Sequence, residues 1–162
     1  MSAGDIHPDL SNLAMLIGSW SGWGRGDYPT IDAFEYGEHV EIAHSGRPFL
    51  TYVQRTVRSG DHPESGSPLH AETGYFRPAG SGGVELVLAQ PGGIVEVHEG
   101  TATDGTIHLR SSLAGGTATA KEVRTVERRI VVAADVMTYE LRLGAVGREH
   151  QLHLTAELRR TS

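Results

Sequence analysis

The chain has 162 residues, no cysteine and a formal net charge of −6. This length suits a single domain with its own core, and the lack of cysteine excludes disulfides, thiolate catalysis and cysteine-ligated zinc or iron–sulfur sites. The negative charge argues against binding to nucleic acid or to a membrane surface. The chain shows no signal-peptide pattern and no apolar run near the roughly 18 residues that span a membrane, so we expect a cytoplasmic protein.

A short helix is expected near the start of the chain. Asp9 or Ser11 could cap it, and Gly18 would end it. The apolar residues that would share one face of this helix are Leu10, Leu13, Leu16 and Ile17.

The remainder of the chain is a series of short strand-like runs separated by glycine, proline, aspartate and serine. We predict ten strands, over residues 18–26, 34–43, 48–58, 69–78, 83–90, 93–101, 105–112, 122–133, 136–145 and 149–160. Several of them alternate apolar and polar residues, as antiparallel strands with two unlike faces do. Ten consecutive strands with short turns would curl and close. The expected fold is therefore all-β, with residues 1–162 forming one ten-stranded antiparallel up-and-down β-barrel that has room for a small ligand.

The first strand carries an unusual glycine pattern. Gly18, Gly22, Gly24 and Gly26 occupy alternate positions and therefore lie on one face, together with Trp20. A face without side chains permits the close approach of a backbone, a helix or a flat ligand. The sequence leaves a ligand contact as one explanation and barrel curvature or packing of the N-terminal helix as an equal one, and it favours Trp20 as a core residue.

Four sequence motifs occur in a fixed order along the chain. Residues 18–24, GSWSGWG, fit the pattern GxWxGxG and continue as RGDYPTI over 25–31. TGYFR at 73–77, TATAKEV at 117–123 and HLTAELRR at 153–160 follow. In these motifs the chain resembles the nitrobindin family over nearly its whole length. Trp23 departs from many relatives, which have a small or charged residue there, and this puts the shape of the pocket in question.

The resemblance implies a barrel of the fatty-acid-binding-protein type that holds heme b at one open end. It implies His153 as the axial iron ligand and as the catalytic position, with Thr30 and Lys121 as further heme contacts. The implied activity is the conversion of peroxynitrite to nitrate at ferric iron, with nitric oxide as a further iron ligand. Peroxynitrite and nitric oxide are thus the expected small-molecule partners, and homodimerisation stays open.

The alternation of the last strand does not by itself select His153. His153 shares a face with Gln151, Thr155 and Glu157, whereas His150 shares a face with Leu152, Leu154, Ala156 and Leu158. If the leucine face lines the lumen, His150 is the better inward residue. Neutral imidazole is a good iron ligand in either place, so the family motif selects His153 and His150 stays the alternative.

Three functions remain open from the sequence: a heme enzyme that isomerises peroxynitrite, a non-catalytic carrier or sensor of nitric oxide or heme, and a lipid-type carrier without iron. Thr30 could bond a heme propionate or cap a turn, and Lys121 could pair with a propionate or be solvated. The candidate apolar contacts to a porphyrin are Phe34, Phe49, Tyr75, Met137 and Leu152, although ordinary core packing would also explain each of them.

Overall fold

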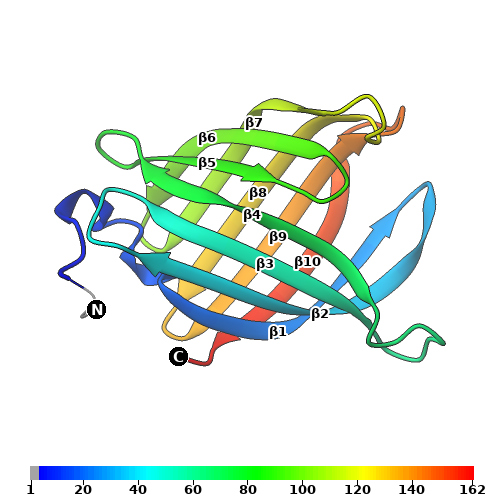
Figure 1. Ribbon diagram of the computed structural model, residues 1–162, viewed down its shortest axis with the longest axis horizontal. Coiled ribbons are helices and arrows are strands. Elements are labelled where there is room, and N and C mark those ends of the chain that lie inside the picture. Colours follow the sequence, from blue (N-terminus) through cyan, green and yellow to red (C-terminus); the bar gives the residue numbers. More distant parts are fainter. Residues whose placement is uncertain (1–3) are drawn as a thin grey trace.

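The computed structural model describes residues 4–162 and shows ten antiparallel strands closed into one barrel (Figure 1). The strands are β1 (Gly18–Tyr28), β2 (Ile31–His44), β3 (Leu50–Ser59), β4 (Pro68–Pro78), β5 (Gly83–Ala89), β6 (Ile94–Thr103), β7 (Thr106–Gly116), β8 (Val123–Ala133), β9 (Val136–Ala145) and β10 (Gln151–Arg160). Each strand pairs with its neighbours in sequence, and β1 pairs with β10 to close the barrel. All ten predicted strands are therefore confirmed, with ends that differ by a few residues.

The predicted N-terminal helix is wrong in type. Two short 3-10 turns, η1 (Pro8–Leu10) and η2 (Ala14–Leu16), stand in its place. Leu10, Leu13 and Leu16 are completely buried, and their spacing of three residues matches the 3.0 residues per turn of a 3-10 helix. The cap also differs from the prediction, because the His7 side chain accepts from the Asp9 amide. No helix within residues 4–162 has the length and apolar character needed to cross a membrane.

The two 3-10 turns cover one end of the barrel, at the left of Figure 1. Trp20 is fully buried at this closed end, and its indole Nε1–H donates to the Leu16 carbonyl at 2.9 Å. The expectation that Trp20 is a core residue is confirmed. The other core side chains around the turns include Val40, Ile42, Leu50, Phe76, Val84, Leu86, Ile107, Leu109, Met137 and Leu158.

The opposite end of the barrel is open. Successive antiparallel strands place their connections at alternate ends, so the β1–β2, β3–β4, β5–β6, β7–β8 and β9–β10 connections all lie there. The β1–β2 hairpin projects beyond the barrel at the right of Figure 1. Thr30, Lys121 and His153 lie on or beside these connections, so the topology brings the three predicted site residues to one end.

The glycine face of β1 is filled by aromatic rings from β2. Gly24 pairs with Tyr36 and Gly26 pairs with Phe34. A Cβ atom at Gly24 would collide with the Tyr36 ring, and one at Gly26 would collide with the Phe34 ring. Gly24 and Gly26 thus let two rings lie across the inner wall, while a Cβ atom at Gly22 would collide with the backbone of β10.

Candidate functional site

His153 is the extra residue of a β-bulge. In the pairing of β10 with β9, Leu152 lies opposite Arg142 and Leu154 lies opposite Leu141. Two residues of β10 thus advance against one residue of β9, and His153 has no partner on β9. Bulges interrupt the alternation of faces and re-aim side chains. The His153 ring consequently packs against the buried ring of Tyr28, with 5.3 Å between the ring centroids. Simple alternation, which places His153 outward if the leucine face lines the lumen, fails here because it assumes an unbroken strand.

The backbone fixes the protonation of the His153 ring. Nδ1 lies 2.9 Å from the carbonyl oxygen of Asp27, and because a carbonyl can only accept, Nδ1 carries the proton and Nε2 keeps its lone pair. Burial lowers the pKa of His153 against the opposing effect of the Asp27 hydrogen bond, so the ring is neutral at neutral pH. A neutral imidazole whose other nitrogen donates to a carbonyl is the form that commonly ligates metals.

A cavity of about 680 Å³ opens beside His153, which is within the size range of small-molecule and cofactor sites. Its apolar lining near His153 includes Phe34, Leu152 and Leu154. The remaining lining residues are Arg25, Gly26, Asp27, Ala33, Glu35, Arg58, Ser59, Asp61, His62 and Thr155. The cavity thus joins the ends of β1, β2, β3 and β10 with the β3–β4 connection.

The other predicted heme contacts do not line the cavity. Thr30 is exposed in the β1–β2 turn and Lys121 is exposed in the β7–β8 connection. His150, the alternative ligand, is held elsewhere: its Nδ1 lies 2.9 Å from the Thr125 hydroxyl and its Nε2 lies 3.4 Å from a carboxylate oxygen of Glu127. Of the two histidines, only His153 lines the cavity.

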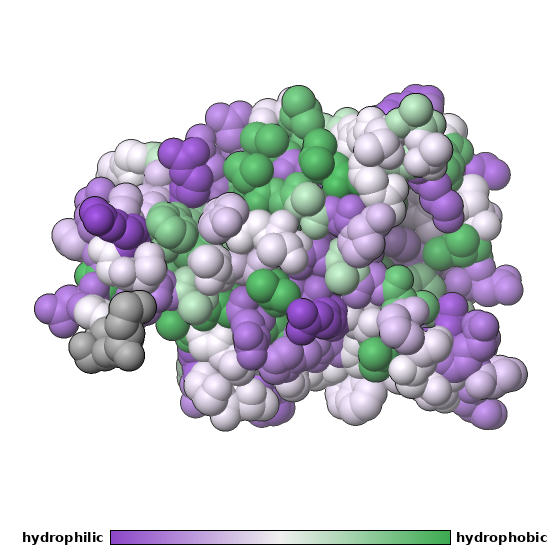
Figure 2. Space-filling view, in the orientation of Figure 1, coloured by the Kyte–Doolittle hydropathy of each residue, from purple (hydrophilic) through white to green (hydrophobic). Residues whose placement is uncertain are grey.

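Several apolar candidates are placed away from the cavity. Phe49 and Tyr75 pack edge to face with 5.7 Å between ring centroids, and Tyr75 is half exposed. Figure 2 shows apolar surface over the β5–β6 part of the outer wall, where Val87 and Val95 are also exposed. Trp23 is 69% exposed on the outside, so this departure from the family leaves the inner pocket unchanged.

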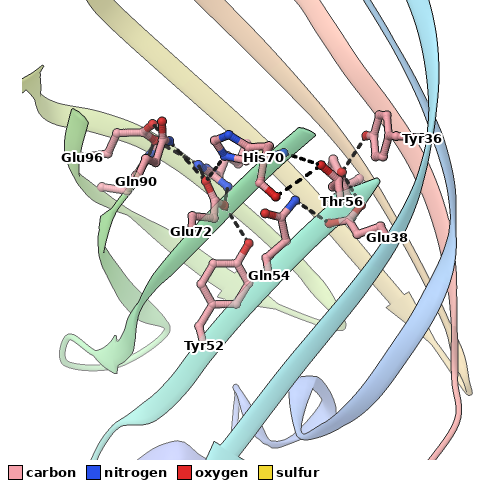
Figure 3. A network of polar contacts seen from close by, with 12 residues as sticks. Tyr36, Glu38, Tyr52, Gln54, Thr56, His70, Glu72, Gln90 and Glu96 are labelled. Carbon is pink, nitrogen blue, oxygen red and sulfur yellow. Dashed lines mark hydrogen bonds and ion pairs between the residues drawn. The ribbon is translucent and has the colours of Figure 1, made fainter. Parts of the chain in front are cut away.

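A group of polar side chains that was not predicted from the sequence lies inside the barrel, and we call it the polar belt (Figure 3). The polar belt consists of Tyr36, Glu38, Tyr52, Gln54, Glu72, Glu96, His98, Arg128 and Tyr139. Along β2, Glu38 lies between Phe34 at the cavity and Val40 in the core. The belt therefore separates the cavity from the apolar core. The sequence does contain a pattern that indicates the belt, namely polar residues on the otherwise apolar face of a strand. Glu38, between Tyr36 and Val40 on the inward face of β2, is an example.

Arg128 is the centre of the polar belt. Its Nη1 donates to Glu72 at 2.6 Å and its Nη2 donates to Glu96 at 3.0 Å. Burial by itself raises the pKa of Glu72, but Arg128 and a hydrogen bond from His70 outweigh it and hold the pKa well below its usual range. Glu96 behaves in the same way, with its pKa lowered by Arg128 and His98. Both carboxylates are thus ionised and paired, the condition under which charges are tolerated in a protein interior.

Glu38 behaves in the opposite way. Tyr139 donates to one of its carboxylate oxygens at 2.5 Å and Gln54 donates to the other at 3.1 Å. Burial raises the pKa of Glu38 to about 7 in spite of these two hydrogen bonds. Because this exceeds the ordinary value of 4.5, the folded protein retains a proton that the unfolded chain releases. Glu38 therefore lowers the free energy of unfolding as pH rises from about 4.5 to about 7.

We expect Glu38→Gln to remove this decline. The Gln54 amide can flip to accept from the new amide, since its buried Oε1 has no partner within residues 4–162. Relative to the wild type, the variant should gain roughly 3 kcal/mol in free energy of unfolding between pH 5 and pH 8. Urea unfolding of both proteins at the two pH values measures this difference. Parallel pH profiles would show that Glu38 does not titrate in this interval.

Known proteins resemble this chain in both sequence and structure. It is 50% identical over 162 residues to the protein named peroxynitrite isomerase 2 of Mycobacterium ulcerans (strain Agy99), with 98% of each chain covered. It is 47% identical to the protein named peroxynitrite isomerase of Nocardia farcinica (strain IFM 10152), over 96% of this chain and 92% of the relative. The crystal structure of Rv2717c from M. tuberculosis matches with a TM-score of 0.88 at 46% identity, covering 98% of this chain and all of that one.

A match to the model of a protein family shows the family of the chain. The model of the family described as THAP4-like, heme-binding beta-barrel domain matches residues 9–160. The chain belongs to this family. Heme is accordingly the cofactor of this heme-binding β-barrel.

The open end of the barrel offers the two kinds of contact that a heme needs, an axial ligand and apolar side chains. A porphyrin supplies four nitrogens to its iron, so one axial imidazole is enough to hold it. Within residues 4–162, no group of three or more histidine, aspartate and glutamate side chains is placed to hold a bare metal ion. The free Nε2 of His153 beside the apolar side chains of Phe34, Leu152 and Leu154 offers a flat macrocycle both an axial ligand and apolar contacts.

Tyr28 supports the His153 ring through their edge-to-face contact. Its hydroxyl accepts from the Ala145 amide at 2.9 Å and donates to the Leu143 or the Ala145 carbonyl, at 3.1 and 3.3 Å. These bonds tie the end of β1 to the end of β9, across the start of β10 where His153 lies. In this heme-binding β-barrel, Tyr28 and Asp27 thus hold the imidazole from two sides.

We expect Tyr28→Phe to lower the free energy of unfolding by about 1–3 kcal/mol, because it leaves the Ala145 amide without its partner in a buried place. Heme should also dissociate faster, since the edge contact with His153 remains but its anchor is lost. Urea unfolding and the rate of hemin transfer to apomyoglobin measure the two effects. Tyr75→Phe on the outer wall is the matched control and should change neither quantity. Equal effects of the two substitutions would contradict the bracing role.

Proposed function

We propose that this chain is a peroxynitrite isomerase that binds heme b through Nε2 of His153. The main observation in support of this proposal is the His153 ring beside the cavity. The Asp27 carbonyl holds the proton of this ring on Nδ1, and apolar side chains line the cavity next to it. The names of the relatives from M. ulcerans and N. farcinica support the reaction. The membership in a heme-binding family supports the cofactor.

When bound, ferric heme supplies a Lewis acid that promotes the conversion of peroxynitrite to nitrate. Peroxynitrite and nitrate are isomeric anions, so the overall reaction needs no proton from the protein. The work of the chain is then to hold and orient. His153 donates its lone pair, Asp27 and Tyr28 fix its ring, and the apolar side chains at the cavity exclude water.

Thr30 and Lys121 are proposed as contacts at the propionate edge of the heme. Both are exposed and both lie on connections at the open end. Propionates are charged and face solvent in a heme held at a mouth, so exposed side chains on the surrounding loops can reach them. Lys121 would act there as a mobile point charge. We also propose nitric oxide as a ligand of the same iron.

The polar belt argues against a lipid-type carrier. At the centre of the barrel, Arg128 is not free to pair with a fatty-acid carboxylate, because it is already bonded to Glu72 and Glu96. An alkyl chain would also have to displace the hydrogen-bonded side chains of the belt, at the cost of unsatisfied polar groups. Kinetics separates the enzyme from a non-catalytic carrier or sensor of heme or nitric oxide.

Stopped-flow decay of peroxynitrite with heme-loaded protein tests the proposal. We expect faster decay than in buffer and a raised yield of nitrate over nitrite, measured by ion chromatography. Free hemin at the same concentration controls for chemistry that needs no protein. Decay no faster than in buffer would leave only a binding role for the heme.

A further inference from the structure

Arg58 lies at the mouth of the barrel on the inner face of β3. In this strand, Tyr52, Gln54 and Thr56 are buried at alternate positions. Arg58 continues the same row toward the open end, opposite Tyr36 in the register with β2. It lines the same cavity as His153. Its side chain therefore belongs to the inner wall of the site and not to the outer surface.

The Arg58 guanidinium lacks an internal partner. Its Nε atom is buried and has no hydrogen-bond acceptor within residues 4–162. Among the described residues 4–162, several arginines form ion pairs, but Arg58 forms none. Arg128, which also points into the barrel, differs because Glu72 and Glu96 neutralise it. A buried guanidinium N–H without an acceptor is costly, which indicates an acceptor that the chain itself does not supply.

The acidic residues that line the cavity are not positioned as that acceptor. Asp27, Glu35 and Asp61 line it together with Arg58. The Glu35 carboxylate packs against Gly60, and Glu35 alternates with the inward residue Tyr36, which places it on the outer face of β2. None of the three pairs with Arg58 among the ion pairs of the described chain.

We propose that Arg58 is the anion-binding group of the cavity and binds a carboxylate or a small oxyanion that lies across from His153. The planar guanidinium offers two parallel N–H donors to such a group, a geometry that lysine cannot reproduce. Two sources have this chemistry: a heme propionate, and the free anions of the reaction, peroxynitrite and nitrate. The choice between these sources rests on the proposed function, whereas the anion site itself rests on the geometry of Arg58.

Hemin titrations followed at the Soret band test the propionate source. Arg58→Gln should bind hemin on the order of tenfold more weakly than the wild type, which is the usual loss for one charge-assisted hydrogen-bonded pair. Arg58→Lys should recover only part of the affinity. Arg55→Gln removes the same charge from an outward position three residues away on β3 and serves as the matched control. Hemin dimethyl ester, which lacks carboxylates, should bind wild type and Arg58→Gln equally.

Calorimetry with sodium nitrate tests the free-anion source on the heme-loaded protein. Weaker nitrate binding in Arg58→Gln, with unchanged hemin affinity, would assign Arg58 to the small anions of the reaction. Equal behaviour of Arg58→Gln and Arg55→Gln toward both hemin and nitrate would overturn the proposal. A wild type that gives no Soret band with hemin would instead end the proposed function, and nitrate binding to the protein as purified would then decide the role of Arg58. Circular dichroism of each variant confirms that it is folded.

Discussion

Replacing His153 with alanine is expected to abolish the Soret band of a stable heme complex while leaving the barrel folded. The imidazole is the proposed protein ligand to the iron, and its removal should weaken hemin binding by at least about 100-fold, since even loss of a supporting group around a ligand can cost that much. The fold should persist because His153 lies in a bulge at the open end, outside the apolar core. Absorption spectroscopy with added hemin and far-ultraviolet circular dichroism measure the two effects.

His150→Ala is the matched control, because His150 is bonded to Thr125 and Glu127 outside the cavity. We expect this variant to keep the wild-type hemin affinity. Hemin affinity that survives in His153→Ala but is lost in His150→Ala would transfer the ligand role to His150. Imidazole added to His153→Ala should restore part of the Soret band by filling the vacated ligand position.

Replacing Arg128 with methionine is expected to cause the largest loss of stability, about 3–5 kcal/mol, because it removes the guanidinium that neutralises two buried carboxylates. Glu72 and Glu96 are both nearly inaccessible to solvent. In the wild type their pKa values are lowered, so they stabilise the fold above their unfolded values and lose this effect as pH falls. In the variant, the Arg128 charge no longer offsets burial, and both pKa values rise. Urea unfolding at pH 7.5 measures the loss.

The stability of Arg128→Met should depend on pH, because the pKa values of Glu72 and Glu96 are lowered in the wild type and raised in the variant. Its deficit relative to the wild type should be large at pH 7.5 and should shrink as pH falls and the carboxylates become protonated. Adding Glu72→Gln and Glu96→Gln to the variant should restore part of the stability at pH 7.5, because no buried charge then remains unpaired. Arg129→Met, an exposed neighbour, should change stability little. A deficit that is equal at all pH values would contradict this account of the polar belt.

The strands were predictable because their signals are local. Apolar and polar residues alternate with a period of two, and glycine-containing turns punctuate them, as at Asp104 and Gly105, which both have positive φ. The N-terminal segment was predictable as helical and buried but not as a 3-10 turn, since leucines three apart satisfy both kinds of helix. The resemblance in the motifs singled out His153, but no local pattern explained how an outward parity becomes an inward contact.

The sequence by itself determined that this chain forms ten antiparallel strands and carries one motif histidine at the start of the last of them. Tertiary structure alone decided three things: the bulge that turns His153 toward Tyr28, the ion pairs that let Arg128 stay buried, and the unpaired position of Arg58. The physical reason is the range of the interactions. Alternation and turns depend on adjacent residues, whereas register shifts and buried charge pairs depend on partners brought together from distant strands.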